Sequence, residues 1–145
     1  MPTIKEAKIK IESRIENLDE AGMSIGDVER AVTECEGFYY VCPPDFKITY
    51  TERGEGGEVS CEIVRSGDSL TVKRQGAIES TLVFRKGEEY SGIYSVVPYK
   101  FDITVSTRRL DVSLDDMGGS IDLLYNMSIG GADKAVRMKI WIQTS

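Results

Sequence analysis

Residues 120–129 read Ser-Ile-Asp-Leu-Leu-Tyr-Asn-Met-Ser-Ile, and this stretch decides the fold class. Its apolar side chains recur at every second position from Ile121 to Ile129. Successive side chains of a β-strand point to opposite faces of the sheet, so this alternation predicts a strand with one dry face and one wet face. Glycine pairs at 118–119 and 130–131 predict a turn at each end of the strand.

The same two-residue alternation recurs along the rest of the chain. Further strands are expected over residues 8–16, 28–41, 46–51, 58–65, 70–74, 78–85, 90–97, 103–114 and 136–143. Turns are expected where Gly, Pro and Asp gather, at residues 42–45, 53–57, 66–68, 85–88, 115–119 and 130–133. The acidic, glycine-containing stretch 17–27 is expected to be a loop with room for one helical turn. The strand over 28–41 is expected to bend at Gly37.

These elements predict the architecture. Short turns make neighbouring strands antiparallel, and the pattern contains no convincing amphipathic helix. A meander of about 8–10 strands either closes on itself or splits into two sheets, and closure alone removes the exposed edges. We therefore predict a single all-β domain over residues 1–145, folded as a closed antiparallel up-and-down β-barrel. A two-sheet sandwich is the alternative.

The apolar phase slips once inside a predicted strand, over residues 103–114. Ile103 is apolar at an odd position, whereas Leu110 is apolar at an even position. A one-residue slip of this kind indicates a β-bulge, here near residues 107–109. Bulges re-aim side chains, so one of Arg108 and Arg109 is expected to point inward, with Arg109 as a candidate ligand contact. The alternative is a barrel corner at which both arginines face solvent.

Composition excludes several classes of protein. The chain has 145 residues, of which 41% are hydrophobic and 29% charged, as in ordinary globular proteins. The net charge of −6 argues against a nucleic-acid partner. No apolar run is long enough to span a bilayer as a helix, so no membrane association is expected. Residues 1–6 carry charge and no apolar signal region, which predicts a cytoplasmic protein.

The absence of histidine and the small number of cysteines limit the chemistry. Without histidine, the chain lacks the commonest general base and the commonest ligand of transition metals. Cys35, Cys42 and Cys61 are expected to be reduced thiols, at least two of them buried. A Cys35–Cys42 disulfide across a hairpin and a zinc site completed by a carboxylate are the alternatives. No metal and no cofactor are expected.

The second half of the chain carries a recognisable pattern. Residues 70–84 read Leu-Thr-Val-Lys-Arg-Gln-Gly-Ala-Ile-Glu-Ser-Thr-Leu-Val-Phe, and the pattern continues through Tyr94 to Pro98-Tyr99, Thr107-Arg108-Arg109-Leu110 and residues 118–125. It resembles the YwiB-like family, uncharacterised small bacterial proteins with a lipocalin-like (calycin) β-barrel. The segments Gly37-Phe38-Tyr39 and Tyr50-Thr51-Glu52 resemble that family's first half. Lys100 stands where the family tends to place glycine.

The resemblance implies a cytoplasmic bacterial protein whose barrel has a lumen of ligand size. It implies no particular activity, substrate or catalytic residue. The candidate site is therefore assembled from this chain's own residues.

Arg74 is the most informative single residue. It shares the phase of Leu70 and Val72, so it is expected to face the barrel interior. An inward arginine is costly unless its charge is paired, which makes it a candidate clamp for a carboxylate or phosphate of a ligand. The alternatives are a structural pair with an inward carboxylate and a position at the barrel end where the side chain reaches water.

Several tyrosines fall in phase with apolar neighbours. Tyr50, Tyr94 and Tyr125 are candidate ligand contacts, because a tyrosine hydroxyl beside an arginine can help to hold an anionic group. The alternative is that they are core residues with satisfied hydroxyl groups.

The sequence thus favours a barrel that binds a small apolar or anionic ligand, with Arg74 and the tyrosines at the anionic end. A filled barrel acting as a protein-interaction module is the second possibility. An enzyme using tyrosine, arginine or Cys61 is the third, and the missing histidine makes it the least favoured.

Overall fold

The computed structural model describes residues 3–42, 45–54 and 56–144, and these residues form strands and turns. The ten strands are β1 (Thr3–Leu18), β2 (Ser24–Cys42), β3 (Asp45–Gly54), β4 (Gly57–Ser66), β5 (Ser69–Gly76), β6 (Ser80–Arg85), β7 (Glu89–Val96), β8 (Tyr99–Asp115), β9 (Gly118–Ile129) and β10 (Ala132–Thr144). In the described part of the chain, no helix is long and apolar enough to cross a membrane.

All ten strands belong to one antiparallel sheet that curls round on itself. Its order is β6-β5-β4-β3-β2-β1-β10-β9-β8-β7, so strands adjacent in sequence pair with each other except β6 and β7, and the first strand pairs with the last. The two ends of this order meet at Glu79 and Ser95, whose backbone groups exchange two hydrogen bonds of 2.9 Å. The result is a nearly closed up-and-down barrel, and the predicted all-β antiparallel barrel is confirmed.

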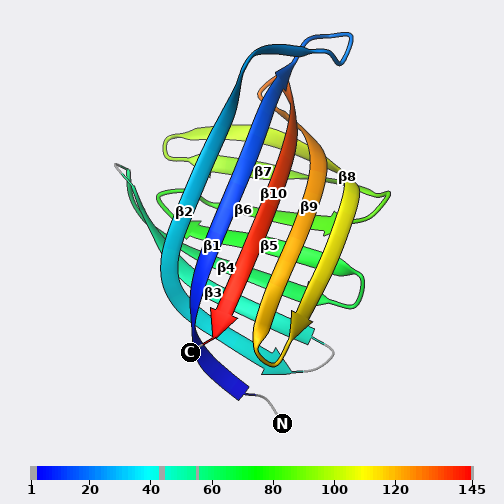
Figure 1. Ribbon diagram of the computed structural model, residues 1–145. Coiled ribbons are helices and arrows are strands. Elements are labelled where there is room, and N and C mark those ends of the chain that lie inside the picture. Colours follow the sequence, from blue (N-terminus) through cyan, green and yellow to red (C-terminus); the bar gives the residue numbers. More distant parts are fainter. Residues whose placement is uncertain (1–2, 43–44, 55, 145) are drawn as a thin grey trace.

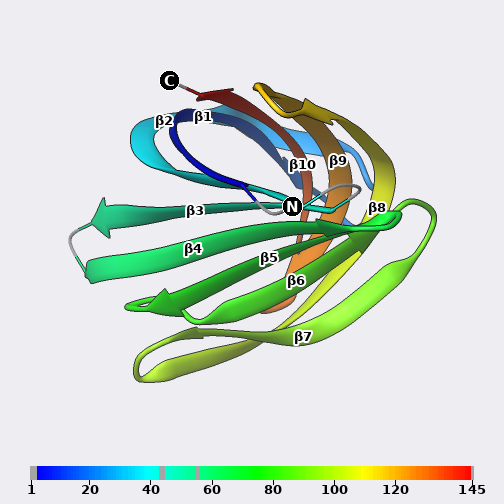
Figure 2. The same ribbon diagram turned by 90° about the horizontal axis from the view of Figure 1, so that it is seen from below.

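The barrel has two walls whose strands cross. In Figure 1, strands β1, β2, β8, β9 and β10 run steeply across the front, and β3 to β7 run behind them. Figure 2, seen from below, shows the long strands curving over the shorter ones. The side chains of the two walls therefore face each other across the interior.

One predicted loop is much shorter than expected. Instead of a loop over residues 17–27, β1 and β2 extend to a tight turn over residues 19–23. The Oδ1 atom of Asp19 accepts hydrogen bonds from the backbone N–H groups of Ala21 and Met23, both 2.9 Å. The acidic and glycine residues of this stretch are typical of loops, which is why the sequence predicts a loop. The hairpin is stabilised by backbone pairing and does not require an apolar face. The prolines of the predicted 42–45 turn, Pro43 and Pro44, lie outside the described residues.

The predicted β-bulge is confirmed. The register between β8 and β9 shifts between Thr107 and Arg109. The backbone of Thr107 exchanges hydrogen bonds with the β6–β7 turn, accepting from Gly87 at 2.9 Å and donating to Glu88 at 3.0 Å. The bulge is therefore a barrel corner, where β8 leaves β7 and meets the preceding turn.

The bend at Gly37 marks the point where β2 changes neighbours. Strand β2 pairs with β3 only over Gly37–Cys42, and its earlier residues pair with β1 alone. A Cβ atom at Gly37 would collide with the carbonyl oxygen of Thr49 and lie 2.9 Å from Cδ1 of Ile9. Glycine is therefore required for the close approach of the three strands, and Figure 1 shows β2 curving through this region.

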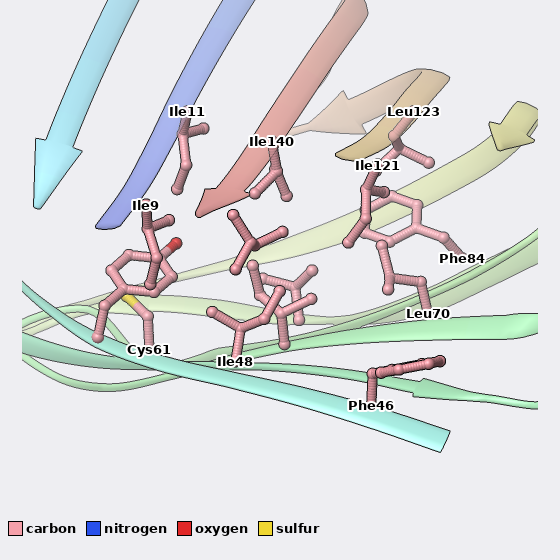
Figure 3. Packing of buried hydrophobic residues seen from close by; sticks show 14 of the residues in the cluster. Ile9, Ile11, Phe46, Ile48, Cys61, Leu70, Phe84, Ile121, Leu123 and Ile140 are labelled. Atoms are coloured by element: carbon pink, nitrogen blue, oxygen red, sulfur yellow. The ribbon is translucent and has the colours of Figure 1, made fainter. Parts of the chain in front are cut away.

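The interior of the barrel is filled with side chains from both walls. Fully buried members include Ile9 and Ile140 from the long strands and Ile48 and Leu70 from the short ones. Figure 3 shows these residues meeting across the centre. Two aromatic pairs belong to the cluster. The rings of Tyr39 and Phe46 are stacked with their centroids 5.8 Å apart, and the rings of Phe84 and Tyr125 are tilted with their centroids 4.7 Å apart.

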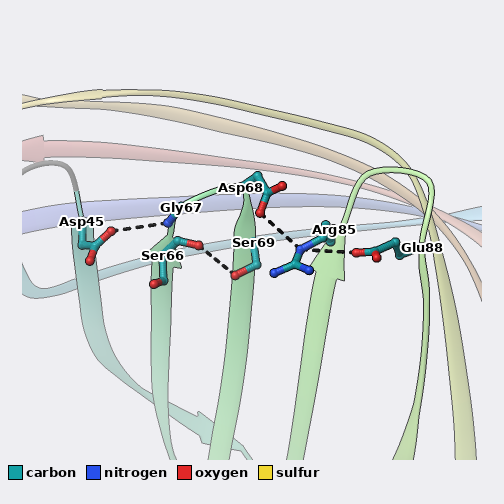
Figure 4. A network of polar contacts seen from close by, with 7 residues as sticks. All are labelled: Asp45, Ser66, Gly67, Asp68, Ser69, Arg85 and Glu88. Carbon is teal, nitrogen blue, oxygen red and sulfur yellow. Dashed lines mark hydrogen bonds and ion pairs between the residues drawn. The ribbon is translucent and has the colours of Figure 1, made fainter.

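Polar contacts tie together the turns at one end of the shorter strands (Figure 4). The Nε atom of Arg85 lies 3.2 Å from Oδ1 of Asp68 and 3.3 Å from Oε2 of Glu88. The Ser69 hydroxyl donates to the carbonyl oxygen of Ser66 at 2.9 Å. These groups are largely exposed, so they set the turn geometry more than they stabilise the fold.

Candidate functional site

Inward-facing polar side chains form a row across the shorter strands. Tyr50 pairs in register with Cys61, Cys61 with Arg74, and Arg74 with Ser80. The bridge between Glu79 and Ser95 places Tyr94 next in this series. We call Tyr50, Cys61, Arg74, Ser80 and Tyr94 the polar row. It interrupts the apolar lining because each member occupies an inward position of its strand.

Arg74 faces the interior, as its phase with Leu70 and Val72 predicts. Its Nη2 atom lies 3.7 Å from Oε1 of Glu52, and the two side chains are 26% and 27% exposed. The Nε atom of Arg74 is buried and has no hydrogen-bond partner among the described residues. The guanidinium is thus paired in charge with an inward carboxylate but has spare donor capacity.

The guanidinium of Arg74 stays protonated although it is largely buried. Desolvation lowers the pKa of the guanidinium, but the carboxylate of Glu52, together with Tyr50, Cys61 and Tyr94, raises this pKa above its ordinary value. The group therefore remains a cation at all physiological pH values.

The neighbouring tyrosine hydroxyls are neutral donors at physiological pH. Burial raises the pKa of Tyr50, and the Cys61 and Glu52 groups raise it further against the opposing effect of Arg74. Burial also raises the pKa of Tyr125, on the opposite wall, to about 12, while Arg74 acts to lower it. Tyr94 is half-buried and lies close enough to influence both Arg74 and Tyr125. The structure therefore brings four of the predicted site residues together.

Arg109, the fifth predicted site residue, lies apart from the others. Its side chain is 57% exposed and is hydrogen-bonded through Nε to Asp111 on the outside of the barrel, at 2.5 Å. Arg108 is exposed as well, so the expectation that one of the two points inward is wrong. The extra residue of the bulge lets the inward phase resume at Leu110 and leaves both arginines outside, which is the barrel-corner alternative.

The three cysteines are free thiols. Cys61 is 2% exposed, and its pKa is raised to about 11, chiefly by burial. Cys35 is partly buried and Cys42 exposed, so only one of the three is fully buried. Cys35 and Cys42 both lie on β2, and a disulfide across a hairpin is not formed. Among the described residues, no group of three or more Cys, Asp or Glu side chains could hold a metal ion.

Sequence reasoning missed two polar residues of this region. Glu52, which pairs with Arg74, lies just beyond the strand predicted over residues 46–51, although it comes two positions after Tyr50 and shares its phase. Thr107 is 2% exposed, and its Oγ1 atom has no hydrogen-bond partner among the described residues. The phase with Tyr50 could have identified Glu52, and the phase of Ile103 and Val105 could have placed Thr107 inside, just before the bulge.

Two open grooves border the polar row. One, of about 350 Å³, is lined by Arg74 and Ser80 together with Glu79 and Ser95. The other, of about 740 Å³, is lined by Tyr50 and Cys61 as well as by exposed residues of the outer face, among them Thr51, Ser60 and Gln75. The centre of the barrel, in contrast, is occupied by the buried cluster. A ligand of the polar row would therefore reach the guanidinium through the exposed quarter of the Arg74 side chain.

Comparisons with known proteins agree with this fold. The uncharacterised β-barrel protein YwiB of Bacillus subtilis (strain 168) is 28% identical over 94 residues, 65% of this chain. The match spans 66% of that relative's length, just under two thirds. The crystal structure of the ywiB protein from Bacillus subtilis superposes with a TM-score of 0.85 at 24% identity, covering 98% of this chain and 93% of the other.

The last comparison concerns the family as a whole. A family described as "Domain of unknown function (DUF1934)" matches residues 9–140, which include every strand of the barrel in whole or in part. The likeness to lipocalins and other calycins stays a prediction. The chain belongs to this family of β-barrel proteins of unknown function.

Proposed function

We propose that this barrel binds a small molecule through its anionic group, a carboxylate or a phosphate, at the polar row. Arg74 supplies the positive charge, and Tyr50, Tyr94 and Tyr125 supply hydroxyl donors. The observation that carries the proposal is the buried Nε atom of Arg74, which has no hydrogen-bond partner among the described residues. A buried donor left without an acceptor costs about 1–3 kcal/mol, and an anion at this position removes that cost.

The chemistry of the guanidinium supports an anion rather than a neutral ligand. Its N–H groups form a planar fork that matches the two oxygens of a carboxylate or phosphate. Glu52 approaches at 3.7 Å, which is close enough for charge pairing but too long for a hydrogen bond. The carboxylate of Glu52 therefore balances the charge of Arg74 in the free protein without satisfying its donors.

The packed centre sets a limit on the rest of the ligand. Buried side chains from both walls occupy the barrel interior, so the ligand's apolar part must be small or remain near the barrel end. Partly buried apolar residues, Ala77, Ile78 and Leu82, line the neighbouring segments and would contact such a part. We place this activity in the cytoplasm of a bacterium, which is supported by the three free thiols and the bacterial relative.

A titration with matched variants tests the proposal. Inorganic phosphate and hexanoate serve as probes in calorimetry, and native mass spectrometry of freshly purified protein detects a retained anion. Arg74→Met should weaken anion binding by about 1.5–3 kcal/mol, which is roughly tenfold or more. Glu52→Gln should strengthen binding, because it removes a competing carboxylate.

Arg109→Met is the matched control, since it removes an arginine from the outer face. It should bind the probes as the unaltered protein does. Equal affinity of the Arg74→Met variant and the unaltered protein, or no binding of either probe, would overturn the proposal.

The packed interior also favours a second function, that of a protein-interaction module. A filled barrel offers a partner its outer faces and its strand edges rather than its lumen. Strand β2 offers such an edge, because before Gly37 it pairs with β1 alone.

A further inference from the structure

Part of strand β2 has an edge without a neighbouring strand. Residues Glu29–Glu36 of β2 pair with β1 on one side, but β3 joins β2 only from Gly37 onwards. On its other side, this segment has no paired strand among the described residues. We call residues 29–36 the free edge. Every second residue of such an edge presents unpaired backbone N–H and C=O groups.

The free edge is regular enough to accept another strand. Its register with β1 is continuous from Glu29 to Val41, and the irregularity of β2 lies before this stretch, between Ile25 and Glu29. The free edge itself contains no proline, and its register shows no bulge, so two devices that normally block strand addition are missing. Val32, at its centre, is 60% exposed and offers an apolar contact.

The charges of the free edge select the partner. Glu29, Glu34 and Glu36 are all exposed, against the single cation Arg30. On β1, Lys10 and Lys8 lie opposite Glu34 and Glu36 in register, but none of the three carboxylates forms an ion pair with another described residue, and Lys10 pairs with Glu12 instead. Antiparallel pairing with a second copy would bring two acidic edges together, which costs free energy. A basic strand would instead neutralise them.

The structure also offers a place for the end of an added strand. The groove of about 740 Å³ lies at the fork where β3 separates from β2, with Cys35 to Phe38 on one side and Thr49 to Thr51 on the other. Phe38 is 47% exposed beside this groove. A strand lying along the free edge would run directly into the fork.

We propose that the free edge of β2 binds an extended, basic segment of a partner protein by strand addition. Lysine or arginine side chains at alternate positions of that segment meet Glu34 and Glu36 on the outer face, and its backbone pairs with residues 29–36. Strand addition obtains affinity from backbone hydrogen bonds and specificity from the alternate side chains.

A short peptide that alternates lysine and valine tests the proposal. Fluorescence anisotropy measures its binding to the full chain, and hydrogen exchange locates the contact. We expect binding, and slower exchange of the amides of residues 29–36. The same peptide with N-methylated backbone amides keeps its charge but loses its hydrogen-bond donors, so it should bind at least roughly tenfold more weakly.

Charge-reversal variants provide a second test of the proposal. Glu34→Lys combined with Glu36→Lys should weaken peptide binding by roughly tenfold or more. Glu89→Lys combined with Asp116→Lys, at exposed positions on β7 and in the β8–β9 turn, makes the same change in net charge and should leave binding unaltered. Equal binding of the N-methylated peptide, equal loss in both double variants, or slower exchange elsewhere would each overturn the proposal. So would a dimer formed through β2.

Discussion

Arg74 illustrates how a single inward charge can be accommodated in an otherwise apolar barrel. The two-residue phase of β5 places it inside, and Glu52, on the next strand but one, supplies the balancing charge. Within the polar row, burial raises the pKa values of Tyr50 and Cys61, so both groups are neutral beside the cation of Arg74. At this scale, burial and neighbouring charges together determine protonation, and protonation determines what the row can bind.

Cys61 provides a prediction at the same scale. Its thiol is 2% exposed, and its pKa of about 11 leaves very little thiolate at neutral pH. Iodoacetamide should therefore modify Cys61 far more slowly than the exposed Cys42, and the rate should rise as the pH approaches 11. Peptide mapping by mass spectrometry measures each rate. In denaturant all three cysteines should react alike, and native Cys61 reacting as fast as Cys42 would contradict the assignment.

At the scale of the element, strand β2 connects the two walls. Its first part pairs only with β1, and its last part also pairs with β3. The change occurs at Gly37, where the backbones approach so closely that there is no room for a side chain. The free edge and the groove at the fork both result from this change of partner.

Replacing Gly37 tests this account of β2. Gly37→Ala should lower the free energy of unfolding by about 1–3 kcal/mol, because the new methyl group collides with the backbone of β3 and cannot be relieved by a rotamer change. Gly54→Ala is the matched control, since a Cβ atom there has no neighbour within 4 Å. Urea denaturation measures both. A loss of stability at Gly54 as large as that at Gly37 would show that the close approach is not the cause.

At the scale of the whole molecule, the barrel is closed unevenly. Nine pairs of neighbouring strands form ladders, whereas β6 and β7 are joined through one bridge, between Glu79 and Ser95. The adjoining β6–β7 turn is anchored instead to Thr107 of β8. This seam is consequently the part of the sheet with the fewest backbone hydrogen bonds.

Hydrogen exchange tests the uneven closure. Amides of β7 and of residues 77–81 should exchange faster than those of β1 and β10, because opening the seam breaks few hydrogen bonds. Native-state exchange read by mass spectrometry separates these segments. Uniform protection around the barrel would contradict the prediction.

The sequence alone determined the strand content, the turns and the inward phase of most strands. Alternation of apolar and polar residues is a local property with a period of two, so it identifies the dry face of each strand. It placed Tyr50, Arg74 and Tyr125 inside, and the phase slip in β8 located the bulge. It failed over residues 17–27, where backbone pairing maintains a hairpin without an apolar stripe.

Only the tertiary structure decided which strands meet and what fills the space between them. Glu52 reaches Arg74, and Tyr125 faces the same group from the opposite wall, because the sheet curls round. The outward direction of Arg109, the packed interior and the free edge of β2 likewise depend on closure. The physical reason is that register and curvature depend on contacts between residues far apart in the chain, which a local period does not encode.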